Sequence, residues 1–130
     1  MAGFGREQAM KVKLRPEAAG RDNVRGWLRV GREYVALSVE SITGNRMAYR
    51  IVSEDNRTPA LFGVSLFDVV DGRIPESWVA VRAERDMVHF MPAGWGEAGF
   101  WEAFFDGDPP AARAFEEQVT ELQADSDDAE

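Results

Sequence analysis

The chain has 130 residues, of which 45% are hydrophobic and 29% are charged, a composition typical of one globular domain with its own core. It contains no cysteine, which excludes disulfides and thiolate metal ligands. No run approaches the ~20 apolar residues of a membrane span, and residues 1–10 lack the apolar segment of a signal peptide. We therefore expect a cytoplasmic protein that does not contact a membrane.

The net charge of −8 is concentrated near the end of the chain. Residues 97–130 contain eleven acidic side chains and one basic one, Arg113, and carry −10. The other 96 residues contain 12 acidic and 14 basic side chains and carry +2. Such an acidic segment is often only a solvated helix face with an unstructured tail, but it can also attract a basic partner. Both interpretations stay open from charge alone.

Changes in composition and periodicity predict one α+β domain over residues 10–124. Its first part, 10–91, is expected to be β-rich, and its second part, 97–124, to be helical. Residues 1–9 are expected to form a flexible leader, and 125–130 a disordered acidic tail, because that tail has nothing to bury.

The β-rich part shows alternating apolar and polar residues in short runs separated by turn formers. Six strands are predicted, at or near residues 10–15, 35–39, 46–54, 60–70, 77–83 and 87–91. The second run is expected to place Val35, Leu37 and Val39 on one face. Turns are predicted at 43–45 and 84–86. Short strands at roughly ten-residue spacing favour a small, strongly bent antiparallel sheet or barrel.

After Pro92 the period becomes helical. Phe100, Trp101, Phe104 and Phe105 stand at i, i+1, i+4 and i+5, which predicts a short helix that packs its aromatic side onto the open side of the sheet. A calcium loop in the following acidic corner is excluded, because the oxygen spacing is wrong and two prolines follow. An aromatic cage for a cation has no support in the sequence alone.

A second helix is predicted after that corner. Gly107 is expected to end the first helix, Asp108 to cap the second, and Pro109 to be its first residue. Its apolar stripe is formed by Ala112, Phe115, Val119 and Leu122.

Residues suited to catalysis are few. The single histidine, His89, is predicted on the strand face of Met87 and Met91, where a lone histidine is more typical of structural packing than of catalysis. Ser65 lacks the glycine context of a nucleophile elbow. We therefore expect no enzymatic activity, metal or cofactor. An enzyme that uses His89 or surface carboxylates as acid–base groups is the weakest of the alternatives.

A small-barrel nucleic-acid-binding or regulatory module is a second hypothesis. It depends on arginines near two aromatic residues in the region 21–34, a combination suited to backbone and base contacts. These residues are Arg21, Arg25, Trp27, Arg29, Arg32 and Tyr34. The net negative charge opposes phosphate binding, so nucleic acid is not the expected partner.

Two parts of the sequence resemble known bacterial proteins. "GWLRVGREYVALSV" and "MAYRIVSEDNRTPALFGVSLF" resemble small bacterial SH3-like barrel proteins. The matching residues are Leu28, Gly31, Tyr34, Leu37, Tyr49, Arg50 and Ile51, whereas Ala36 departs from the expected valine. The ending "GFWEAFFDGDP…AFEEQVTEL" is similar to that of bacterial proteins resembling immunity proteins of polymorphic toxin loci.

The resemblance implies an SH3-like sheet or barrel of five or six strands followed by two helices. It also implies a non-catalytic protein-binding module of the immunity type, which neutralises a cognate toxin. We expect the protein to be a monomer. The partner would be a basic toxin domain that docks on the acidic helical surface. The candidate partner-binding residues are Trp101, Asp106, Asp108, Glu116, Glu117 and Glu121.

Overall fold

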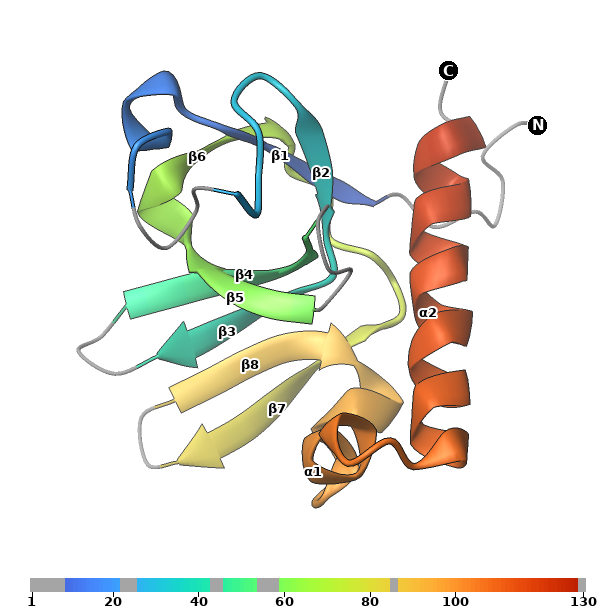
Figure 1. Cartoon of the computed structure of the whole chain (residues 1–130). Coiled ribbons are helices and arrows are strands. Elements are labelled where there is room, and N and C mark those ends of the chain that lie inside the picture. Colours follow the sequence, from blue (N-terminus) through green and yellow to red (C-terminus); the bar gives the residue numbers. More distant parts are fainter. Residues whose placement is uncertain (1–8, 22–25, 43–45, 54–58, 85–86, 129–130) are drawn as a thin grey trace.

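The structure, a computed structural model, describes residues 9–21, 26–42, 46–53, 59–84 and 87–128. These residues form an α+β fold with two antiparallel sheets, of three and five strands, and two α-helices (Figure 1). In this part of the chain, no helix is both long and apolar enough to cross a bilayer.

The two sheets draw their strands from different parts of the chain. The three-stranded sheet has the order β2 (Glu33–Ala36), β1 (Met10–Leu14), β6 (Phe67–Asp71). The five-stranded sheet has the order β5 (Pro59–Gly63), β4 (Arg46–Val52), β3 (Ser38–Ile42), β8 (Met87–Pro92), β7 (Trp78–Glu84). Short one-turn helices lie at η1 (Pro16–Ala18) and η2 (Val64–Leu66).

The chain passes between the sheets at two tight corners and returns a third time through residues 72–77, which join β6 to β7. One corner is Leu37, between β2 and β3, and the other is η2, between β5 and β6. The prediction of one strand with Val35, Leu37 and Val39 on the same face was wrong. Val35 and Leu37 pack on the helix side, whereas Val39 packs between the sheets. The bend is tolerated because the Leu37 N–H still donates to the Arg50 carbonyl oxygen, at 2.8 Å.

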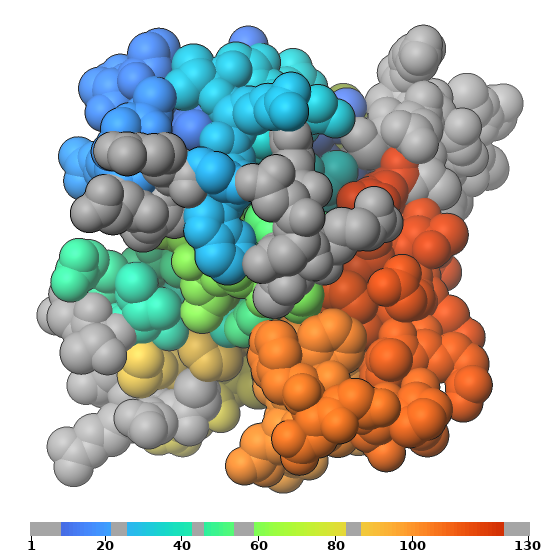
Figure 2. Space-filling model, viewed as in Figure 1, coloured from blue at the N-terminus to red at the C-terminus, as the bar shows by residue number. Residues whose placement is uncertain are grey.

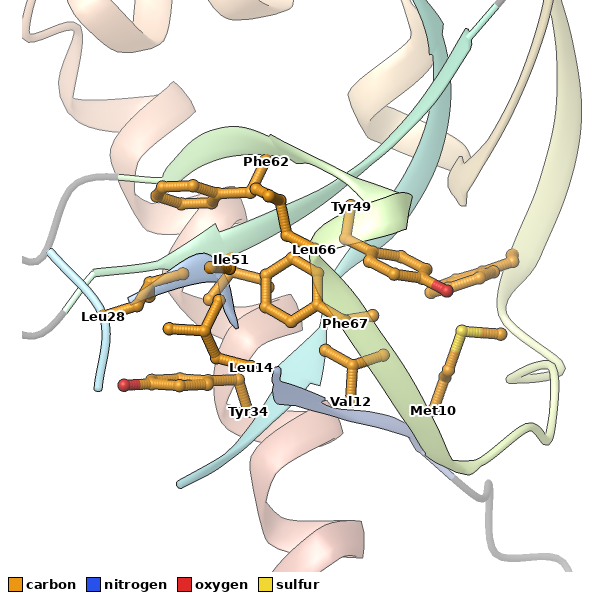
Figure 3. Close-up of a cluster of buried hydrophobic side chains, with 13 residues drawn as sticks. Met10, Val12, Leu14, Leu28, Tyr34, Tyr49, Ile51, Phe62, Leu66 and Phe67 are labelled. Atoms are coloured by element: carbon orange, nitrogen blue, oxygen red, sulfur yellow. The ribbon is translucent and has the colours of Figure 1, made fainter. Parts of the chain in front are cut away.

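A first hydrophobic core fills the space between the two sheets (Figure 3). Val12 and Leu14 of β1 and Ile51 of β4 are at most 1% exposed. Tyr49 meets the edge of Phe67 with ring centroids 5.7 Å apart. Side chains from both sheets interdigitate here, as in packed sheet pairs generally.

A second core lies between the other face of the five-stranded sheet and the C-terminal helices. These helices are η3 (Ala93–Gly96), α1 (Phe100–Phe105) and α2 (Pro109–Asp128). Trp95 is 1% exposed and stacks on Phe115 of α2, with ring centroids 5.1 Å apart. Phe115, Val119 and Leu122 bury the apolar stripe of α2 as predicted, while Ala111 is more deeply buried than Ala112.

The predicted corner between the helices is confirmed. Gly107 has φ of 85°, a left-handed conformation that glycine adopts without strain. The Asp108 Oδ2 accepts a hydrogen bond from the Ala111 N–H at 3.2 Å and caps α2. The helix continues to Asp128, past the boundary at 124 where the acidic tail was expected to begin. Of the expected leader, residues 1–8 lie outside the described part of the chain.

The predicted fold class is confirmed at the level of bent antiparallel sheets with two C-terminal helices. The barrel prediction is wrong, because the two sheets do not close into a barrel. Eight strands, not five or six, are present in the described residues. Each sheet keeps two edge strands there, β2 and β6 in one and β5 and β7 in the other, whereas a barrel requires every edge to pair.

The packing of η3 on the sheet generates a prediction at Gly96. A Cβ atom at this position would lie 2.6 Å from Cγ2 of Val81, whereas one at Gly94 would have no neighbour within 4 Å. Gly96→Ala should therefore lower the free energy of unfolding by about 1–3 kcal/mol through overpacking. Gly94→Ala, the matched control, should change it by less than about 1 kcal/mol. Denaturant unfolding measures both, and equal effects would contradict the packing described for η3.

Candidate protein-binding surface

The acidic residues of α2 lie on its solvent face. Glu116, Glu117 and Glu121 are all exposed, and they line a shallow depression together with Arg113 and Thr120. None of the three carboxylates forms an ion pair with another described residue. The opposite side of the helix is fixed in the second core, so these charges are held on a rigid element.

The two aspartates of the corner have different surroundings. Asp106 is exposed and forms the C-cap of α1 through its backbone N–H. Asp108 is also exposed, but its carboxylate already accepts the capping hydrogen bond from α2. Asp106 is therefore the freer of the two for contact with a partner, and Asp108 has a structural role in any case.

Trp101 is half-buried and belongs to both the second core and the surface. Its ring meets the edge of Trp95, with centroids 5.5 Å apart. On the sheet side, the Arg50 guanidinium carbon lies 4.0 Å from the centroid of the Trp101 ring, which is a cation–π contact. The exposed part of Trp101 lines a second shallow depression with Glu102, Phe105 and Asp106.

Phe105 departs from the predicted arrangement. It was expected to pack on the sheet with the other aromatic residues of α1, but its side chain is 57% exposed. Complete burial of a phenylalanine is worth about 1.5–3 kcal/mol, so much of this apolar surface remains available for a contact. Figure 2 shows α1 and α2 as adjoining orange and red-orange surfaces, so Phe105 and the acidic face of α2 belong to neighbouring elements.

The sequence interpretation missed a buried ion pair beneath Trp101. Arg50 Nε donates to Glu40 Oε2 at 2.8 Å, and Arg50 Nη2 donates to Glu40 Oε1 at 3.0 Å. The two residues are 8% and 5% exposed. Ser38 Oγ also donates to Glu40, at 2.7 Å, and the Pro59 carbonyl accepts from Arg50 Nη1 at 3.2 Å. The pair is thus neutralised and almost fully hydrogen-bonded.

These contacts determine the ionisation of Glu40. Burial by itself raises the pKa of this carboxyl, but hydrogen bonds from Arg50 and Ser38 and the charge of Arg50 outweigh burial. The resulting pKa lies below the usual value of 4.5. Glu40 is therefore ionised at neutral pH although it is buried.

His89 is a packed residue on the face predicted for it. Met87, His89 and Met91 are more buried than Val88 and Phe90, in agreement with the predicted alternation. The Nδ1 atom of His89 accepts a hydrogen bond from the backbone N–H of Ser41 at 3.1 Å. Within the described residues, no three His, Cys, Asp or Glu side chains are grouped so as to hold a metal ion.

The region 21–34 uses its aromatic residues for packing. Tyr34 is 8% exposed and its hydroxyl accepts a hydrogen bond from the Arg29 N–H at 2.8 Å. Trp27 meets the edge of Phe62 with ring centroids 6.5 Å apart. A buried Tyr34 cannot stack on a base, which disfavours the nucleic-acid hypothesis for this face. Arg25 lies outside the described residues.

The sequence matches no family model, and no curated protein or solved structure shows a significant match.

The buried pair generates a prediction about stability. Glu40→Gln and Arg50→Met should each lower the free energy of unfolding by about 3–5 kcal/mol, because each leaves a buried partner uncompensated. The matched control is Arg15→Met, which breaks an exposed ion pair of similar length, 3.0 Å, to Asp68. That change should cost less than about 1 kcal/mol. Denaturant unfolding distinguishes them, and a small effect at Arg50 would contradict the burial of the pair.

The lowered pKa of Glu40 generates a prediction about pH. Because the folded-state pKa lies below the unfolded value, ionised Glu40 contributes its full stability at pH values above about 4.5. That contribution is lost as the pH falls below 4.5 towards the folded-state pKa. The difference in unfolding free energy between the wild type and Glu40→Gln should therefore be constant near neutral pH and shrink in acid. A difference that stays constant down to pH 3 would contradict this assignment.

Proposed function

We propose that the protein is a non-catalytic binding module that docks a basic protein partner on the surface formed by α1 and α2. The observation that carries the proposal is the row of exposed carboxylates, Glu116, Glu117 and Glu121, on a helix whose other side is locked in a core. Fixed charges on a rigid helix speed diffusional encounter with an oppositely charged partner and orient it.

The most concrete form of this function is immunity to a cognate toxin. Many toxins that act on nucleic acids have basic clefts, and a row of carboxylates can occupy such a cleft in place of phosphates. The resemblance of the segment from Gly99 to Leu122 to the endings of immunity-like bacterial proteins supports this form. An immunity protein that blocks the toxin's cleft needs only to bind it tightly, so no catalytic residue is assigned.

We also propose that the sheets are an opened variant of an SH3-like architecture. The features that support this idea are the two corners, at Leu37 and at η2, which carry the chain from one sheet to the other. The three-stranded sheet packs on one face of the five-stranded sheet, and the helices cover the other face. In this arrangement the β-structure serves as the scaffold and the helices as the recognition surface.

The test begins with capture of partners from the source-cell lysate at low salt and at high salt, followed by identification by mass spectrometry. A basic partner that is lost at high salt is expected, and its toxicity on expression should be relieved by co-expression of this protein. Recovery of nucleic acid, or of no partner, would contradict the proposal. A gene for the captured partner immediately upstream would support immunity.

Charge reversal then tests the surface with the purified partner. Glu117→Lys combined with Glu121→Lys should slow association by about tenfold or more, because electrostatic steering acts mainly on the association rate. The control is Glu17→Lys combined with Glu76→Lys, which makes the same charge change at exposed positions of η1 and of the segment between β6 and β7. The thermal midpoints of both variants should stay near that of the wild type. Equal slowing by both variants would mean that only net charge matters.

A further inference from the structure

The exposed side of α1 carries two parallel rows of side chains. Trp101 and Phe105 stand at i and i+4, and Glu102 and Asp106 stand beside them with the same spacing. Residues four apart are neighbours on a helix surface. These four side chains line one shallow depression, so an aromatic row and an acidic row face the same space.

The aromatic row is accessible and held in place. Phe105 is 57% exposed, and its ring centroid lies 5.9 Å from that of Trp101 with an angle of 31° between the rings. Trp101 is fixed from behind by the Arg50 guanidinium, 4.0 Å from its ring centroid. Arg50 is neutralised by Glu40, so it adds no net positive charge behind the depression.

The carboxylates of the acidic row have no partner among the described residues. Neither Glu102 nor Asp106 forms a side-chain hydrogen bond or an ion pair with any of them. Two carboxylates beside aromatic faces repel anions such as phosphate, and a purely apolar occupant would bury them without compensation. The depression therefore complements a flat cation.

We infer that this depression binds an arginine side chain of the partner. A guanidinium group is planar, stacks on aromatic rings, and donates in a fork that matches carboxylate oxygens. Its plane would lie against Phe105 and the exposed part of Trp101, and its N–H groups would donate to Glu102 and Asp106. Lysine offers a strongly hydrated point charge with no stacking face, so it would bind more weakly.

This inference rests on the proposed function, since the arginine belongs to the basic partner, and it adds a specific anchor beside the steering charges of α2. Buried arginine and aromatic contacts are the usual anchors of protein interfaces, whereas exposed charges mainly set the rate of encounter. The two parts of the surface can therefore be tested separately.

The experiment uses the full chain with ¹⁵N-labelled tryptophan and follows the indole N–H signals by NMR. The probes are three blocked tripeptides, Gly-Arg-Gly, Gly-Lys-Gly and the neutral isostere Gly-citrulline-Gly. The signal of Trp101, assigned with Trp101→Phe, should shift saturably with the arginine peptide, less with the lysine peptide, and not with the citrulline peptide. Equal shifts with arginine and citrulline, or no shift with arginine, would overturn the inference.

Matched variants locate the binding. The double variant Glu102→Gln with Asp106→Asn should lower the affinity for the arginine peptide by about fivefold or more, and so should Phe105→Ala alone. Glu117→Gln with Glu121→Gln removes the same charge and should weaken it by less than about twofold. If both charge variants lower the affinity equally, the peptide is attracted by the overall negative charge and not bound in the depression, and the inference is overturned. If the peptide fails to bind while partner capture still depends on Glu117 and Glu121, the depression is refuted and the proposed function stands.

Discussion

The ion pair between Glu40 and Arg50 is the interaction on which the helical surface depends. A helix of six residues, such as α1, is not stable alone in water, so its position must come from packing. Arg50 provides part of that packing, because its guanidinium is held by Glu40 on the sheet and lies against the ring of Trp101. Desolvating this pair costs free energy, which its near-complete set of hydrogen bonds offsets.

The fold separates structural residues from accessible ones in a consistent way. The three-stranded sheet packs on one face of the five-stranded sheet, and η3, α1 and α2 pack on the other. On the first face the coverage is partial, since Val88 and Phe90 of β8 remain 39% and 40% exposed. The solvent-exposed side of α1 and α2 is mainly acidic, and Phe105 is its most exposed aromatic residue. A rigid surface of this kind loses little conformational entropy when a partner binds, which favours specific recognition by the helices.

The two helices were predicted well because the residues that start, stop and orient them lie close together in the sequence. The glycine stop, the aspartate cap and the apolar stripe of α2 are each defined by neighbouring residues. The corner at Leu37 escaped prediction, since strand alternation continues through it while the chain changes sheets. The Glu40–Arg50 pair was also missed, although a signal existed: the predicted turn at 43–45 sets Ser38 opposite Arg50, with Glu40 on the same face. The exposure of Phe105 depends on tertiary packing that spacing alone cannot resolve.

A basic partner is proposed to cover the outer surface of α1 and α2. The most direct measurement is carboxyl footprinting, in which exposed Glu and Asp side chains are labelled with a carbodiimide and an amine, with and without the captured partner. Labelling of Glu102, Glu117 and Glu121 should be reduced in the complex, with Glu17 unchanged. Unchanged labelling of the helices, together with protection at Glu17 or Glu33 on the three-stranded side, would contradict the proposal.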